Sequence, residues 1–306
     1  MFIRICIVFF LFNLAFFSLY GQENRALFVA IDNYPPNSGW AKIHATNDRN
    51  IIIPMLKKNG YKNENIKILL NENATKAAII KGLNDLNKRS RKGDFIYIHF
   101  SCHGQQMADD NGDEPDGLDE ALIPYDAKRR YAKGMYEGNN HLRDDELEYH
   151  LEKVRAKIGN TGNLTVVLDA CHSGTGTRDE GEGVYVRGTA YVFAPDDYIQ
   201  AEIDNGKLNL NLKKGKMLPP ITVFSACREN EINYEYKDAN GEYYGSLSYA
   251  FCKLVTSLQG LSNAGFSERL EKEMKMMFAG KRWKQTPFIE STDNNKIFSI
   301  GGQANK

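Results

Sequence analysis

Between Arg25 and the end of the chain, short apolar runs alternate with longer segments in which apolar residues recur at helical spacing. The runs predicted as strands are residues 26–31, 66–70, 95–100, 164–168 and 221–225. The segments predicted as helices are residues 47–58, 75–88, 144–158, 247–258 and 268–278, the first of which contains Pro54. Strands that are apolar along their whole length are buried on both faces. The alternation therefore predicts an α/β fold with a mostly parallel sheet covered by helices on both faces.

The balance of charge excludes several function classes. The 306 residues include 39 Lys and Arg and 39 Asp and Glu, so the formal net charge is zero. A chain without a net positive field is not concentrated on nucleic acid or on acidic membranes. We therefore expect no nucleic-acid partner. The hydrophobic content of 42% excludes a disordered chain and is enough for one large core.

The first 21 residues have the layout of a signal peptide. Arg4 precedes an uncharged apolar run over residues 5–17, and small residues follow before Gln22. The apolar run is short for a membrane-spanning helix. We therefore expect residues 1–21 to be removed, the mature chain to be secreted or periplasmic, and no stable membrane span to remain. An uncleaved membrane anchor is the alternative.

Two long polar segments interrupt the alternation. Residues 106–126 hold seven carboxylates between Asp109 and Glu120, and residues 175–219 are polar and rich in Gly and Lys. Loops of this length inside a compact domain are usually functional or flexible. Because the strands on either side of the second segment fit one sheet, residues 22–306 are predicted to form a single domain.

Two predicted strands end in residues that can carry chemistry. One ends in Ser101-Cys102-His103-Gly104, and another in Asp169-Ala170-Cys171-His172-Ser173-Gly174. The carboxyl ends of parallel strands open onto one crevice. If these strands are neighbours, the His103 imidazole faces the Cys171 thiol, which is the geometry of a thiol nucleophile with its proton-transfer partner. The alternative is a buried thiol beside a histidine whose hydrogen bonds are satisfied.

Two further observations bear on this pair. His172 directly follows Cys171, so its side chain is expected to point to the other side of the strand. The glycines Gly104 and Gly174 leave room for backbone amides to approach an oxyanion. The remaining cysteines, Cys102, Cys227 and Cys252, lack the CxxC spacing of a zinc site and are too few for a disulfide scaffold.

These motifs resemble the caspase-like cysteine peptidases, and most closely the metacaspase and bacterial orthocaspase branch. The resemblance rests on residues 101–104, on the acidic loop 111–120 and on residues 169–174, in that order. It continues in residues 25–32, 47–48 and 222–228. The resemblance implies a three-layer sandwich with a sheet of about six strands. It also implies a large-subunit-like part (22–174), a linker loop (175–219) and a small-subunit-like part (220–306).

The resemblance also implies a catalytic mechanism. Cys171 would be the nucleophile that attacks a peptide carbonyl to give a thioester, and His103 would transfer a proton to the leaving amine. The backbone amides of Gly104 and Cys171 would form the oxyanion hole. No cofactor is required for this chemistry.

Substrate preference is expected to follow from charge. Asp169 lies two residues before Cys171, on the same side of the strand. The resemblance places Asp48 in the same pocket, with Ser101 lining it. Two carboxylates in a partly desolvated pocket favour a cation, and arginine can pair with them bidentately. We therefore predict cleavage after Arg, then Lys, and not after Asp. The alternative for Asp48 is a carboxylate that stabilises a helix start.

The acidic loop is a candidate calcium-binding site. The loop fits the spacing of an EF-hand at several positions, but Glu114 stands where that motif requires glycine. The resemblance instead implies calcium activation through scattered aspartates, and the candidates are Asp116, Asp119, Asp144 and Asp145. The alternative is a solvated loop in which Asp144 caps a helix.

Two regulatory features are also predicted. Cys102 stands where the family has glycine, and a disulfide between Cys102 and Cys171 would silence the enzyme; an ordinary small residue is the alternative. The linker 175–219 offers basic residues for self-cleavage, and an ordinary flexible loop explains it equally well. The candidate self-cleavage sites are Arg178, Arg187, Lys213, Lys214 and Lys216.

The sequence therefore predicts a secreted cysteine endopeptidase that takes peptide or protein substrates with a basic residue before the cut. Two other interpretations stay open. One is a catalytically silent caspase-like binding module, in which the cleft or acidic loop holds a partner. The other is a thiol transferase or transpeptidase with the same Cys and His pair.

Overall fold

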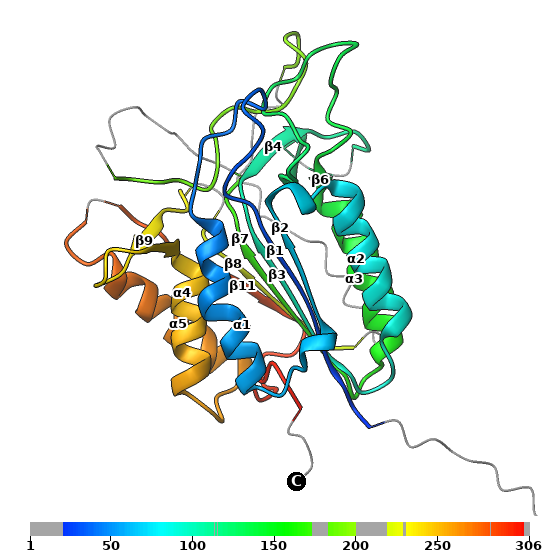
Figure 1. Cartoon of the computed structure of the whole chain (residues 1–306), viewed down its shortest axis with the longest axis vertical. Helices are drawn as coiled ribbons and strands as arrows, with labels where there is room; N and C mark the ends of the chain where they lie inside the picture. Colours follow the sequence, from blue (N-terminus) through cyan, green and yellow to red (C-terminus); the bar gives the residue numbers. More distant parts are fainter. Residues whose placement is uncertain are drawn as a thin grey trace, which may run out of the picture.

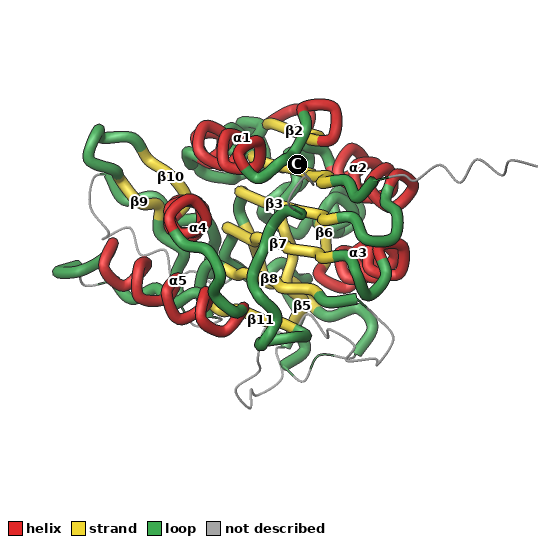
Figure 2. The backbone as a smooth tube through the Cα atoms, turned by 90° about the horizontal axis from the view of Figure 1, so that it is seen from below, coloured by secondary structure: helices red, strands yellow, loops and turns green. Residues whose placement is uncertain are grey.

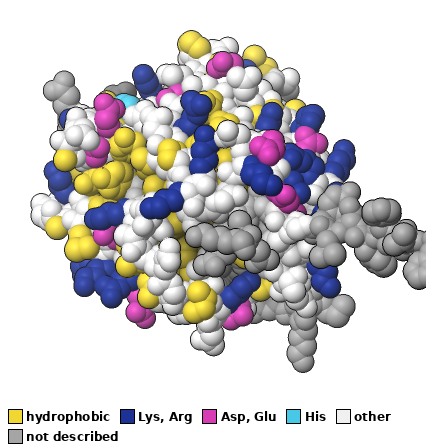
Figure 3. Space-filling view, turned by 60° about the horizontal axis from the view of Figure 1, so that its bottom comes forward, with side chains coloured by type: hydrophobic (Ala, Val, Ile, Leu, Met, Phe, Trp, Pro, Cys, Tyr) yellow, Lys and Arg dark blue, Asp and Glu magenta, His cyan; other side chains and the backbone are white. Residues whose placement is uncertain are grey.

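The computed structural model describes residues 21–112, 114, 116–172, 183–199, 219–228, 231–281 and 283–302. The predicted signal peptide, apart from Gly21, lies outside these ranges, as does most of the predicted linker. No helix within the described ranges is both long and apolar enough to cross a bilayer. Basic and acidic side chains are interspersed on the face that Figure 3 displays.

A six-stranded sheet forms the centre of the molecule (Figure 1). Five strands run parallel, and the strand at one edge pairs antiparallel with its neighbour. In spatial order the strands are β11 (Phe288–Ser291), β8 (Ile221–Ser225), β7 (Asn163–Asp169), β3 (Phe95–Ser101), β1 (Asn24–Ala30) and β2 (Ile66–Leu70). The five strands predicted from the sequence are confirmed.

Helices cover both faces of this sheet, as Figures 1 and 2 show. One face carries α1 (Arg49–Lys58), α4 (Ser246–Ser257) and α5 (Asn263–Met277), and the other carries α2 (Lys76–Arg89) and α3 (Asp144–Ile158). The strands alternate accordingly, since Leu27 and Val29 of β1 belong to one hydrophobic cluster and Ala26 and Phe28 to the other. The predicted three-layer α/β sandwich is confirmed.

Four helices begin and end within two residues of the predicted positions, whereas α5 begins at Asn263, five residues before the predicted start at residue 268. Residues 45–48, which include the first two positions of the predicted helix 47–58, form a short 3-10 turn, and α1 begins at Arg49. Pro54 lies inside α1 although it cannot donate a backbone hydrogen bond. The helix persists because residues on both sides of Pro54, among them Ile53 and Met55, are buried against the sheet.

Two small antiparallel sheets were not predicted. Part of the acidic segment belongs to a three-stranded sheet of β4 (Gly104–Ala108), β5 (Leu118–Leu122) and β6 (Leu142–Arg143). A hairpin of β9 (Glu235–Lys237) and β10 (Tyr243–Gly245) precedes α4. These strands have two to five residues each, too few to show a hydrophobic period. The hairpin contributes residues to the site described next.

Candidate active site

The two motif-bearing strands are neighbours in the sheet, as the sequence analysis required. Ser101, the last residue of β3, pairs in register with Asp169, the last residue of β7. His103 and Cys171 each follow two residues later, so the ends of adjacent parallel strands present them at the same edge of the sheet. Both residues are only 1% exposed. A Cβ atom added to Gly104 would lie 2.6 Å from the Cys171 carbonyl oxygen, so the two backbones touch where the motifs meet.

The imidazole of His103 is held in one orientation. Its ring stacks on Trp40 with the centroids 4.9 Å apart, and its Nε2 lies 2.9 Å from the Ala41 carbonyl oxygen. A carbonyl can only accept a hydrogen bond, so Nε2 carries the proton and Nδ1 does not. Nδ1 is buried and has no hydrogen-bond partner among the residues that the structure describes. Burial lowers the pKa of His103 to about 4, which keeps Nδ1 available as a proton acceptor at neutral pH.

The sulfur of Cys171 contacts the Glu231 carbonyl and the Cys227 thiol, both in the described part of the chain. The thiol donates a hydrogen bond of 3.1 Å to the Glu231 carbonyl oxygen. The Sγ atom of Cys227 lies 3.3 Å from that of Cys171. Cys102, which was predicted as the cysteine that could bridge to Cys171, instead packs in the hydrophobic cluster beneath α2 and α3. The thiol that reaches Cys171 is therefore Cys227.

The two amides predicted to form an oxyanion hole share one acceptor. The backbone nitrogens of Gly104 and Cys171 lie 3.2 and 2.9 Å from the carbonyl oxygen of Arg187. Two convergent N–H groups beside a thiol are the arrangement that stabilises the oxyanion of an acyl-transfer reaction. In this structure the chain's own peptide carbonyl occupies them.

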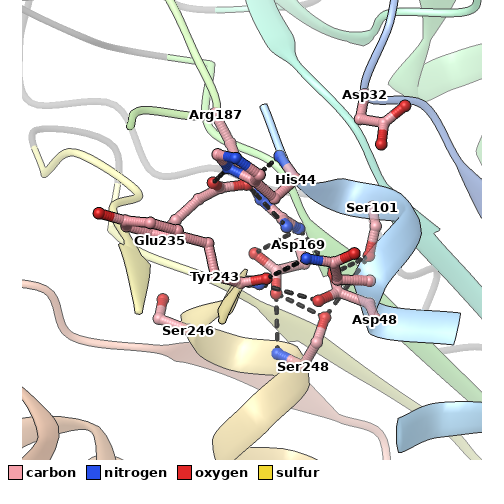
Figure 4. Close-up of polar contacts among 12 residues, drawn as sticks. Asp32, His44, Asp48, Ser101, Asp169, Arg187, Glu235, Tyr243, Ser246 and Ser248 are labelled. Carbon is pink, nitrogen blue, oxygen red and sulfur yellow. Dashed lines mark hydrogen bonds and ion pairs between the residues drawn. The ribbon is translucent and has the colours of Figure 1, made fainter. Parts of the chain in front are cut away.

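The side chain of Arg187 fills an acidic pocket beside those amides (Figure 4). Its Nη1 lies 2.9 Å from Asp48 and 3.5 Å from Asp169. Its Nε and Nη2 each lie 3.1 Å from one oxygen of Glu235. All four side chains are fully buried. Asp48 and Asp169 therefore lie where the sequence analysis expected pocket carboxylates, and Glu235 is a third.

The pocket carboxylates are themselves held by hydrogen bonds. The Ser101 hydroxyl donates to Asp48 at 2.7 Å and the Gly245 amide at 2.9 Å, while the Ser248 hydroxyl donates to Asp169 at 2.6 Å. Ser101 therefore positions Asp48, and its hydroxyl also lies within hydrogen-bond distance of His99 and Ser248. A Cβ atom on Gly245 would lie 2.1 Å from Asp169 and 2.4 Å from Arg187, so glycine leaves the space that the guanidinium fills.

Burial and charge oppose each other in this pocket. Burial and the Asp169 carboxylate raise the pKa of Asp48 to about 6, although the Arg187 guanidinium lowers it. Burial raises the pKa of Glu235, but Arg187 and His44 outweigh burial, so this pKa lies below its usual range. Burial lowers the pKa of Arg187, but the three carboxylates hold it above its usual range. The carboxylates thus need a cation, and they favour its charged form.

The backbone around Arg187 pairs with a neighbouring segment as a short strand. Val186 forms an antiparallel bridge with Tyr234. The Arg187 amide donates to the Asn233 carbonyl at 3.0 Å, and the Glu235 amide donates to the Tyr185 carbonyl at 2.9 Å. Extended pairing of this kind is one way in which proteins bind a peptide.

The four candidate calcium ligands lie at the acidic loop and the start of α3. Asp116 accepts a hydrogen bond from its own loop, and Asp145 accepts one from Asn111. Asp144 is the first residue of α3, and burial raises its pKa to about 7. Asp119 forms an ion pair with Arg143.

Within the described ranges, one group of three His, Cys, Asp or Glu side chains has its possible metal-ligand atoms within 4.8 Å of one another. It consists of Asp109, Asp110 and Asp119, so it shares only Asp119 with the predicted set. Arg143 also lies 3.2 Å from Asp110, so a guanidinium neutralises part of this cluster. The carboxylate donors suit calcium, but the arginine would have to move for a cation to bind.

His172 and the linker residue Arg187 lie in the described part of the chain near the site. His172 lines a small cavity with Glu120 and Asp144 beneath the acidic segment, which agrees with the expectation that it points away from the nucleophile. Gly174 and the basic residues Arg178, Lys213, Lys214 and Lys216 lie outside the described residues. Arg187 is the predicted linker residue that the structure places in the site.

Residues 24–178 match the family model for the metacaspase, peptidase C14 domain, which is half of the chain. This chain belongs to the metacaspase family. Metacaspase-1 of Eremothecium gossypii is 25% identical over 297 residues, which cover 85% of this chain and 63% of that protein. Metacaspase III c of Phaeodactylum tricornutum is 30% identical over 196 residues, which cover 62% of this chain and 51% of that protein. This metacaspase therefore spans less than two thirds of the length of these curated relatives.

Solved structures share the fold of this metacaspase. A protein from Geobacter sulfurreducens superimposes with a TM-score of 0.59 at 21% identity, covering 88% of this chain and 93% of that one. Caspase-1 from Spodoptera frugiperda superimposes with a TM-score of 0.56 at 10% identity, covering 93% of this chain and 92% of that one. At these identities the likeness shows a common caspase fold.

Proposed function

We propose that this metacaspase is a cysteine endopeptidase that cleaves peptide bonds after arginine and, less readily, after lysine. The observation that carries the proposal is the position of Arg187. Its guanidinium lies among three buried carboxylates, while its carbonyl oxygen accepts hydrogen bonds from two amides beside the Cys171 thiol. A substrate residue that precedes a scissile bond must place its side chain and its carbonyl in this same relation.

The proposed reaction uses the groups at the two strand ends. The Cys171 sulfur attacks the carbonyl carbon of the residue in the pocket, and its proton passes to Nδ1 of His103. The amides of Gly104 and Cys171 stabilise the oxyanion. The His103 proton then passes to the leaving amine, and water hydrolyses the thioester. Nδ1 is the atom that exchanges the proton, since the Ala41 carbonyl holds Nε2.

The pocket supports the proposed order of substrates. Arginine can bond through Nη1 to Asp48 and through Nε and Nη2 to Glu235. Lysine has one terminal nitrogen and cannot make both sets of bonds at once. An aspartate side chain would add a fourth negative charge to three buried carboxylates, so cleavage after aspartate is not expected.

We also propose that the chain cleaves itself in the linker, at the bond between Arg187 and Gly188. This bond directly follows the carbonyl that lies on the two amides. The strand-like pairing of residues 185–187 with residues 233–235 presents the bond in an extended conformation. While the bond is intact, the Arg187 segment occupies the pocket and excludes other substrates. The uncut chain is therefore proposed to be latent.

Secretion or a periplasmic location, and activation by calcium, are further parts of the proposal. The signal-peptide layout of residues 1–21 supports the first. The carboxylates Asp109, Asp110 and Asp119 support the second, with Arg143 released when calcium binds. These residues would supply oxygen ligands, and the ion would act on the loop and not on the reacting bond.

Fluorogenic peptides that end in Arg, Lys or Asp test the proposal. The chain and its Cys171→Ala variant are incubated with calcium under reducing conditions to allow self-cleavage and are then assayed with calcium or with a chelator. Turnover is expected for Arg, then Lys, and at least about 1,000-fold less in Cys171→Ala. Equal turnover by the variant, or a preference for Asp, would overturn the proposal. A folded, incubated chain that cleaves no peptide would favour the silent binding module.

A further inference from the structure

A second thiol lies against the nucleophile. Cys227 follows β8, the strand next to β7, and its Sγ atom lies 3.3 Å from that of Cys171. Both cysteines are buried and reduced. The proposed peptidase reaction has no role for Cys227, because the two amides and His103 supply the groups that peptide cleavage needs.

The positions of these thiols are compatible with a disulfide. Leu168 of β7 pairs in register with Ser225 of β8, so Cys171 and Cys227 lie shortly beyond paired residues. The axes of adjacent strands lie about 4.8 Å apart, within the Cα separations that disulfides span. A sulfur–sulfur bond of about 2.05 Å requires the two atoms to approach from their contact by about 1.2 Å.

We propose that Cys227 is a resolving cysteine, which forms a reversible disulfide with Cys171 after a hydroperoxide has oxidised the nucleophile. In the first step the Cys171 thiol passes its proton to Nδ1 of His103, and the thiolate attacks the hydroperoxide. The O–O bond breaks, Cys171 becomes a sulfenic acid, and the leaving oxygen takes the proton from His103 to depart as an alcohol or water. In the second step the Cys227 sulfur attacks the Cys171 sulfur. The S–O bond breaks, and the hydroxyl leaves with the Cys227 proton as water. Two thiols thus supply the two electrons that reduce one hydroperoxide.

The hydrogen bond between the thiols sets the order of these steps. Cys227 donates to the Cys171 sulfur, and this bond together with burial raises the pKa of Cys227 well above its usual range. Cys227 therefore keeps its proton while Cys171 reacts, and it becomes the attacking group once Cys171 is a sulfenic acid. The disulfide would protect Cys171 from the irreversible sulfinic acid, and a thiol reductant would restore the nucleophile.

Mass spectrometry tests this inference on the full chain, without any need for peptidase activity. The reduced protein is treated with hydrogen peroxide, the smallest hydroperoxide, because the nucleophile is only 1% exposed. Peptide mapping without reduction should find Cys171 linked to Cys227. The mass of the chain should fall by about 2 Da, for the two hydrogens lost, and a dithiol should restore it. In Cys227→Ala, Cys171 should instead gain about 32 Da as sulfinic acid, at least about tenfold faster than in the wild type.

Cys102→Ala and Cys252→Ala are the matched controls and should behave as the wild type does. If Cys227→Ala fails to fold, the mapped link in the wild type decides the question alone. The inference is overturned if wild-type Cys171 links to a different cysteine, if it reaches the sulfinic acid as fast as in Cys227→Ala, or if peroxide leaves it unmodified. None of these results bears on cleavage after arginine, which the peptide assay measures separately.

Discussion

The carbonyl oxygen of Arg187 lies 2.9 Å from the backbone nitrogen of Cys171. The same oxygen accepts a second hydrogen bond from Gly104, and the Arg187 side chain fills the acidic pocket next to it. One residue of the linker thus occupies both features on which the proposed activity depends. Its contacts identify which groups should matter for catalysis and which for selectivity.

Asp48→Asn should reduce kcat/KM for arginine peptides by about 100-fold. The substitution removes the negative charge that lies 2.9 Å from the guanidinium, and a hydrogen bond to a charged partner contributes about 1.5–3 kcal/mol. Steady-state kinetics measure the effect. Asp85→Asn is the control, because Asp85 is an exposed carboxylate that pairs with Lys81 on the surface of α2. Unchanged kinetics in Asp48→Asn would favour the helix-start role for this residue.

Glu235→Gln should weaken the preference for arginine over lysine by about tenfold. Glu235 contacts Nε and Nη2 of the arginine, and a lysine in the pocket has neither atom. The loss should therefore fall mainly on arginine peptides. The ratio of kcat/KM for matched Arg and Lys peptides measures it. An equal loss for both peptides would mean that Glu235 contributes charge but no discrimination.

Gly104→Ala should lower kcat by at least about 100-fold by displacing an amide of the oxyanion hole. The added Cβ would lie 2.6 Å from the Cys171 carbonyl oxygen, so the backbone must move. Gly265→Ala is the matched control, since the nearest atom to its added Cβ is 3.4 Å away. Full activity in Gly104→Ala would remove Gly104 from the proposed mechanism.

Much of this architecture follows from residue pattern. Continuous apolar strands and helical periods predicted the sheet and its two covering layers, because burial on both faces leaves a repeating signal. The motifs at the carboxyl ends of two predicted strands were also informative, because the carboxyl ends of parallel strands meet at one edge of the sheet. His103, Cys171, Asp48 and Asp169 were singled out on that basis and through the family resemblance.

The rest of the site depends on chain segments without such a signal. Glu235 lies on a strand of three residues, and Cys227 reaches Cys171 only because β8 lies next to β7. Neither relation can be found from spacing along the chain. Arg187 was one of five candidate self-cleavage sites in the linker, and only the folded structure selects it, through a carbonyl on two amides and three carboxylates around its side chain.

Acidification should destabilise the fold, in part through His99. Burial lowers the pKa of His99 to about 3, whereas the unfolded chain binds a proton near pH 6.5. Because the unfolded state holds more protons between these values, His99 contributes stability above pH 6.5 that is lost as the pH falls toward 3. From pH 7 to pH 5 this single group should lower the free energy of unfolding by about 2 kcal/mol.

Urea unfolding at pH 7 and pH 5 measures this loss, in a Cys171→Ala background to prevent self-cleavage. Adding His99→Gln should lower stability at both pH values, because His99 bonds to Ser248. It should also reduce the difference between the two pH values by about 2 kcal/mol. An unchanged difference would mean that His99 does not titrate on unfolding in this range.

Self-cleavage at Arg187 tests the central claim most directly, because it depends at once on the nucleophile, the amides and the pocket. The purified chain, Cys171→Ala and Arg187→Gln are incubated with calcium under reducing conditions, and the products are identified by intact mass and N-terminal sequencing. The wild type should yield a fragment that begins at Gly188. Cys171→Ala should stay whole, and Arg187→Gln should be cut there at least about 100-fold more slowly. A folded wild type left uncut after Arg187, or Cys171→Ala cut there at the wild-type rate, would contradict the account.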